Sequence, residues 1–131
     1  MTSSPSSPSS LVWEQVVVDS SDPVRLARWW ADALGWVVVS SDDDEPEIRP
    51  TPDTLPGLLF VSVPEAKTVK NRLHLDFRPT PVDGQSREAT QADEVARLES
   101  LGAVRARVGQ DDSDVSWVVL ADPEGNEFCV L

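Results

Sequence analysis

The single histidine of this 131-residue chain lies in a stretch where polar and apolar residues alternate, RLHLDFR. An extended backbone would put the polar side chains, His74 and Asp76 among them, on one face of a strand. The imidazole there can ligate a metal, act as a general base or simply be solvated, and the carboxylate can serve as an acid, a base or the partner of a cation. We predict that His74 and Asp76 are the candidate catalytic residues. The opposite, apolar face should pack beneath a helix (Leu73, Leu75, Phe77).

Residues that the chain lacks exclude several kinds of site. One Cys cannot form an internal disulfide, and one His with one Cys cannot supply the ligands of a structural zinc site. No glycine-rich loop follows a strand pattern, so a phosphate-binding loop is not expected. A Ser-His-Asp triad would have to use His74, and no nucleophile motif accompanies it.

The balance of basic and acidic residues limits the classes of binding partner that we expect. Eleven basic and 23 acidic residues give a formal net charge of −12. Nucleic-acid binding draws on clustered Lys and Arg, so we expect no nucleic-acid partner. A membrane partner is not expected either, because basic clusters are missing and no apolar run approaches the roughly 20 residues that span a bilayer. Among small molecules, the acidity slightly favours a cationic ligand.

The first ten residues, MTSSPSSPSS, differ in composition from the rest. They have neither the basic end nor the apolar stretch of a signal peptide, and their Ser/Pro content is typical of solvated disorder. We therefore expect a disordered tail over 1–10, one domain over 11–131, and a cytoplasmic protein.

The sequence of the domain indicates two copies of one order of secondary-structure elements. Asp22 and Pro23 are typical of a helix start and Gly35 of a left-handed helix end, and Gly102 ends a second helix in the same way. The repeat predicts module one over 11–63 and module two over 72–131, each with a strand, a helix and three strands. The expected strands are 11–19, 36–40, 47–49, 57–63, 72–78, 103–108, 115–121 and 127–131, and the expected helices are 23–34 and 89–101.

Two features are best interpreted as structural. Trp29 and Trp30 are adjacent on the first helix and point about 100° apart, so one should lie in the core and the other at a module or subunit contact. The sequence DPEG at 122–125 is typical of a tight turn, with Pro fixing φ and Gly permitting a positive φ.

Three motifs in this order resemble those of the glyoxalase, bleomycin-resistance and extradiol-dioxygenase group, the vicinal oxygen chelate superfamily. They are DPVRLARWWADALG at 22–35, NRLHLD at 71–76 and DPEGNEFC at 122–129. The resemblance covers about 11–131. It implies an α+β fold of two paired βαβββ modules, with curled mixed sheets around a cleft and the helices outside, where relatives bind a divalent metal and a small ligand.

Carried onto this chain, the resemblance places the family's metal positions at Gln15, His74 and Cys129. A fourth ligand is expected on the strand at 57–63, which contains no carboxylate. Zn²⁺, Ni²⁺ or Fe²⁺ prefers imidazole with carboxylates here, and a neutral amide is a poor substitute. The site therefore resembles a degenerate one, and we expect that no divalent metal is tightly bound.

The same strand faces define a cleft for a small-molecule ligand. Trp13 and Val17 share a face with Gln15, and Glu127 shares one with Cys129, so Trp13, Gln15, Val17 and Glu127 are predicted as ligand-binding residues. The resemblance leaves two functions open. One is a lyase, isomerase or dioxygenase, and the other is a non-enzymatic protein that sequesters a drug or another small molecule. A homodimer is expected, with the cleft inside one chain or across two.

Overall fold

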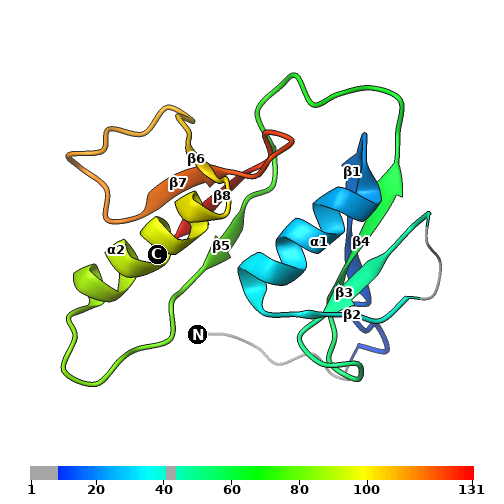
Figure 1. Cartoon of the computed structure of the whole chain (residues 1–131), viewed down its shortest axis with the longest axis horizontal. Helices are drawn as coiled ribbons and strands as arrows, with labels where there is room; N and C mark the ends of the chain where they lie inside the picture. The colour runs from blue at the N-terminus through cyan, green and yellow to red at the C-terminus, as the bar shows by residue number, and fades with distance from the viewer. Residues whose placement is uncertain (1–8, 41–43) are drawn as a thin grey trace.

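The computed structural model describes residues 9–40 and 44–131, so most of the predicted tail, residues 1–8, lies outside the described residues. The chain forms two four-stranded sheets, each with one helix (Figure 1). Module one comprises β1 (Gln15–Ser20), α1 (Pro23–Leu34), β2 (Val37–Val38), β3 (Glu47–Arg49) and β4 (Gly57–Ser62). Module two comprises β5 (Leu75–Phe77), α2 (Arg87–Ser100), β6 (Val104–Arg105), β7 (Val118–Ala121) and β8 (Glu127–Val130).

The two sheets have the same topology. Their strand orders are β1-β4-β3-β2 and β5-β8-β7-β6, and in each sheet the first strand pairs in parallel with the last while the other pairs are antiparallel. The predicted α+β fold of two βαβββ modules is thus confirmed, and the sheets do not close into one. Within the described residues, neither helix has the length and apolar content needed to cross a bilayer.

Local sequence sets the limits of α1. Asp22 caps its start, since Oδ1 accepts a hydrogen bond from the backbone N–H of Arg25 at 3.3 Å, and Pro23 occupies the first turn. Gly35, with φ of 68°, ends the helix in the left-handed conformation that glycine adopts without strain. These predicted limits are confirmed.

The first strand of module two is shorter than predicted. β5 covers Leu75–Phe77, where it pairs with Phe128 to Val130 of β8, instead of the whole of 72–78. Leu75 and Phe77 pack on the core as expected, but Leu73 is 88% exposed, so its predicted place beneath a helix is wrong. Leu73 precedes the paired residues, and no ladder fixes its side chain to one face.

Helix α1 contacts both sheets. The ring centroid of its buried Trp30 lies 5.8 Å from that of Phe77 and 4.8 Å from that of Phe128, and both Phe residues are on strands of the second sheet. Trp29 is partly buried, and its indole N–H donates to the carbonyl of Leu101, beyond the end of α2, at 2.8 Å. The prediction of one core tryptophan and one tryptophan at a module contact is confirmed. With these contacts α1 joins the modules instead of only covering its own sheet.

Module two also supplies charges at both ends of α1. The Glu124 carboxylate accepts hydrogen bonds from Ser20 Oγ at 2.6 Å and from the backbone N–H of Ser21 at 2.9 Å, next to the helix start. Arg97 Nη2 donates to the carbonyl of Ala33 in the last turn at 2.7 Å. The first turn of α1 has no acidic residue and the last has no basic one. Glu124 and Arg97 therefore complement the helix dipole from outside the helix.

Candidate functional site

A pocket of about 560 Å³ lies between the modules. Its walls are β1, the turn between β7 and β8, and the connection 63–74 from β4 to β5, which we call the crossover segment. The volume lies within the range of small-molecule sites. Two of the predicted ligand-binding residues, Val17 and Glu127, line this pocket. Hollows of about 440 and 790 Å³ along α1 contain none of the predicted site residues.

The other predicted residues lie elsewhere. Gln15 opens β1 in the first sheet, and Trp13 precedes that strand with an exposed ring. His74 is exposed at the end of the crossover segment, and its Nε2 lies 3.1 Å from the carbonyl oxygen of Asn71. Asp76 lies beside Cys129, its partner in the ladder of β5 and β8. None of these five residues lines the pocket.

Cys129 is a buried thiol beside a carboxylate. Burial raises its pKa to about 11, and the negative charge of Asp76 and a hydrogen bond to that side chain act in the same direction. At neutral pH the sulfur therefore carries its proton. A protonated thiol is neither a nucleophile nor a ready metal ligand.

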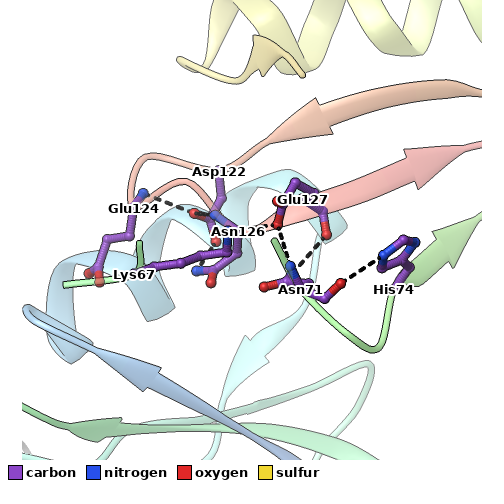
Figure 2. Close-up of polar contacts among 7 residues, drawn as sticks. All are labelled: Lys67, Asn71, His74, Asp122, Glu124, Asn126 and Glu127. Atoms are coloured by element: carbon purple, nitrogen blue, oxygen red, sulfur yellow. Dashed lines mark hydrogen bonds and ion pairs between the residues drawn. The ribbon is translucent and has the colours of Figure 1, made fainter. Parts of the chain in front are cut away.

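Glu127 is held by the crossover segment (Figure 2). Its Oε2 lies 2.9 Å from Lys67 Nζ and accepts from the backbone N–H of Asn71 at 3.2 Å, and the Asn71 side-chain amide donates to the Glu127 carbonyl at 3.2 Å. Burial opposes ionisation of this carboxyl. The hydrogen bond and charge of Lys67, with the backbone N–H groups, outweigh it and lower the Glu127 pKa. Glu127 thus anchors the crossover segment to β8.

The turn between β7 and β8 is built around one buried carboxylate. Asp122 accepts from the backbone N–H groups of Glu124 at 2.9 Å and Asn126 at 3.0 Å, from the Asn126 side-chain amide at 2.8 Å and from the Trp30 indole at 2.9 Å. Gly125 has a φ of 87°. The structural interpretation of this turn is confirmed, and the turn also joins the modules through Trp30 and Glu124.

The three predicted metal ligands belong to different parts of the fold. Gln15 lies in one sheet and Cys129 in the other, and the thiol and the imidazole of His74 each contact another partner. Within residues 9–40 and 44–131, no group of three or more His, Cys, Asp and Glu side chains is placed to hold a metal ion. A protonated thiol, a neutral amide and an exposed imidazole are poor donors for a divalent cation and do not fit one, so we derive no chemistry through it.

Sequence reasoning missed the part of the site formed by the crossover segment. Residues 66–75, AKTVKNRLHL, contain three basic and no acidic side chains in an acidic chain. That local reversal of charge was the available signal. Lys67, Val69, Lys70, Arg72 and Leu73 all line the pocket.

Comparison with known proteins gives a family and a fold. The family model described as "Glyoxalase-like domain" matches residues 15–131. A mutant of the fosfomycin resistance protein FosX from Listeria monocytogenes, complexed with Mn(II) and 1S,2S-dihydroxypropylphosphonic acid, is 9% identical with a TM-score of 0.66, over 94% of this chain and 90% of that one.

Two further solved structures have the same fold. A possible glyoxalase from Bacillus cereus is 14% identical with a TM-score of 0.65, over 93% of this chain and 99% of that one. A glyoxalase/bleomycin resistance protein/dioxygenase family enzyme from Burkholderia phytofirmans is 19% identical with a TM-score of 0.64, over 90% and 95% of the two chains. A search of curated proteins found no match.

Proposed function

The chain belongs to the glyoxalase-like domain family, and we propose that it binds a small molecule in the pocket beneath the crossover segment. The observation that carries this proposal is the exposed apolar lining. Val17, Val69 and Leu73 line the pocket and are 51%, 75% and 88% exposed. A ligand that covers them would remove apolar surface from water, which favours binding.

We propose sequestration of the ligand as the function, the non-enzymatic alternative drawn from the sequence. The chemistry of the candidate groups supports it. Cys129 keeps its proton, and Glu127 is engaged with Lys67 and Asn71. A metal-dependent lyase, isomerase or dioxygenase would need His74 and Cys129 to leave their present partners. The catalytic roles of His74 and Asp76 stay predictions, as does the absence of a tightly bound metal.

The homodimer and the cytoplasmic location also stay predictions. Support for a dimer comes from module two, where β6 is an edge strand and the exposed Val104 lies on it. An open edge with apolar side chains is a surface that a second chain can cover. Sedimentation of the purified protein will determine its oligomeric state.

Binding of a neutral apolar dye tests the proposed function. N-phenyl-1-naphthylamine should fluoresce more strongly on addition of the protein, with EDTA present. Val17→Asp puts a charge on the pocket wall and should lower dye affinity about tenfold, because burial of the dye would then desolvate a carboxylate.

Val38→Asp is the matched control. Val38 is a strand valine of the same sheet with a similar exposure of 55%, and it lines none of the three hollows. Dye affinity should be unchanged in this variant. The absence of dye binding to the parent protein, or equal loss in both variants, would contradict the proposed function.

A further inference from the structure

The crossover segment has a charge opposite to that of the whole chain. Three basic residues and one acidic residue, Glu65, occur within 63–74, although the chain has a formal net charge of −12. All three basic side chains line the pocket between the modules (Lys67, Lys70, Arg72). The ligand therefore meets a cationic wall in an otherwise acidic protein.

These three cations are not equivalent. Lys67 is paired with Glu127 and is only 20% exposed. Lys70 and Arg72 are exposed, and neither makes a side-chain hydrogen bond or an ion pair with any residue of the described part of the chain. They are two residues apart and flanked by the exposed Val69 and Leu73, so charged and apolar groups stand together on one wall.

The acidic groups of the pocket lie outside the stretch 66–75. Asp122 and Glu124 accept hydrogen bonds from the donors of the turn and of the α1 start, and Glu127 is paired with Lys67. Asp19 and Glu65 also line the pocket, and both are exposed. Asp19 belongs to β1 and Glu65 precedes the basic stretch. The stretch 66–75 itself thus keeps two uncompensated cations beside exposed apolar side chains.

We propose that the ligand is an amphipathic organic anion. Its apolar body covers Val17, Val69 and Leu73, and its carboxylate, sulfonate or phosphonate group pairs with Lys70 and Arg72. A guanidinium binds such oxyanions through two parallel hydrogen bonds, and the ammonium adds a point charge. This inference rests on the proposed function and specifies the ligand class of the same pocket, opposite in charge to the cationic ligand that the total charge favours.

Two dyes that share one ring system test the ligand class. 8-Anilino-1-naphthalenesulfonate has the rings of N-phenyl-1-naphthylamine and an added sulfonate. The anionic dye should bind the parent protein about tenfold more tightly, since a charge-assisted hydrogen bond is worth about one such factor or more. The double substitution Lys70→Gln and Arg72→Gln should remove that advantage and leave the affinity for the neutral dye unchanged.

A matched pair of cations provides the control. Arg25 and Arg28 are exposed on α1, make no side-chain ion pair within the described residues and do not line this pocket. Arg25→Gln with Arg28→Gln removes the same two positive charges and should leave both dye affinities unchanged. Cooperative thermal unfolding of each variant ensures that the dye reports on a folded protein.

The outcomes separate the two proposals. Equal affinities for the two dyes, or equal effects of the two double substitutions, would overturn the anionic ligand and leave the small-molecule pocket standing. Binding of neither dye would overturn the proposed function and the ligand class with it.

Discussion

Both modules follow a strand with a helix and three more strands, yet their helices are stabilised by different parts of the chain. Helix α2 has its own complementary charges, with Glu88 in its first turn and Arg97 in its last. Helix α1 has neither and receives Glu124 and Arg97 from module two. Equal topology therefore does not mean equal independence, because the helix of module one depends on side chains of module two.

The first strands differ in a related way. β1 pairs with β4 over six residues, whereas β5 pairs with β8 over three. The chain before β5 is instead held by the contacts of Glu127 with Lys67 and Asn71. Because the β5 ladder is short, the crossover segment lies outside the sheet and forms one wall of the pocket. In module one, the paired strand β1 itself forms a wall.

The largest loss of stability should result from a substitution at the contact between the two modules. Asp122→Ala removes the acceptor of the Trp30 indole and of two backbone N–H groups, and leaves these buried or half-buried donors unpaired. We expect a loss of about 3 to 4 kcal/mol in the free energy of unfolding by urea. The exposed Asp112→Ala should change it by less than about 0.5 kcal/mol. Equal small effects would show that the turn does not hold the modules together.

A smaller difference in stability is expected between substitutions at the start of α1 and at the start of α2. Glu124→Gln exchanges a carboxylate, whose oxygens only accept hydrogen bonds, for an amide, whose nitrogen only donates them. The substitution also removes the negative charge at the start of α1, so we expect a loss of about 1 to 2 kcal/mol in the free energy of unfolding. Glu88→Gln acts on the start of α2 at a side chain that is 73% exposed, and should cost less than about 0.5 kcal/mol. Equal costs would contradict the dependence of α1 on module two.

A weaker effect, below about 1 kcal/mol, should appear in the pH dependence of stability. The Glu127 pKa is lowered in the folded state, so its stabilising contribution is full above the unfolded value of about 4.3 and is lost as the pH falls through the folded value. Unfolding free energies measured from neutral to acidic pH should show the parent protein more stable than Glu127→Gln at neutral pH. The two curves should converge in acid, and a gap that persists there would refute the assignment.

The smallest effect is expected with metal ions. Calorimetric titration with Zn²⁺, Ni²⁺ and Mg²⁺ should show weak binding at most, because no group of three or more His, Cys, Asp and Glu side chains in the described residues is placed to hold a metal ion. Any binding that occurs should favour Zn²⁺ or Ni²⁺ over Mg²⁺ and disappear in His74→Ala, while Cys129→Ser should weaken it less. Tight, stoichiometric Zn²⁺ or Ni²⁺ binding that His74→Ala abolishes would instead support a metalloenzyme.

Much of the fold could be predicted because its signals are local. Asp22, Pro23 and Gly35 fix the ends of α1 through contacts within a few residues. The end of a strand depends on the strand with which it pairs, so the sequence pattern predicts a start of β5 that is three residues too early and a buried position for Leu73 that is wrong.

The site was harder to predict because its contacts span long stretches of chain. Lys67 pairs with Glu127, and the Trp30 indole donates to Asp122. The partners in each pair are so far apart in the sequence that no short motif contains both. The family resemblance supplied positions for ligands, but it could not show that Asp76 and Asn71 contact two of them. Val17 and Glu127 do line the pocket, whereas Gln15 and Cys129, assigned to the same strand faces, do not, because strand alternation assigns a side chain to a face of a sheet but not to a place along it.

Amide chemical-shift mapping tests the central claim, which is metal-free binding beneath the crossover segment, most directly. With 8-anilino-1-naphthalenesulfonate and EDTA, the largest shifts should fall on Val17, Val69, Lys70 and Leu73, and Zn²⁺ added after the EDTA has been removed should not alter them. Shifts centred on Gln15, His74 and Cys129, or shifts that appear only with Zn²⁺, would contradict the account.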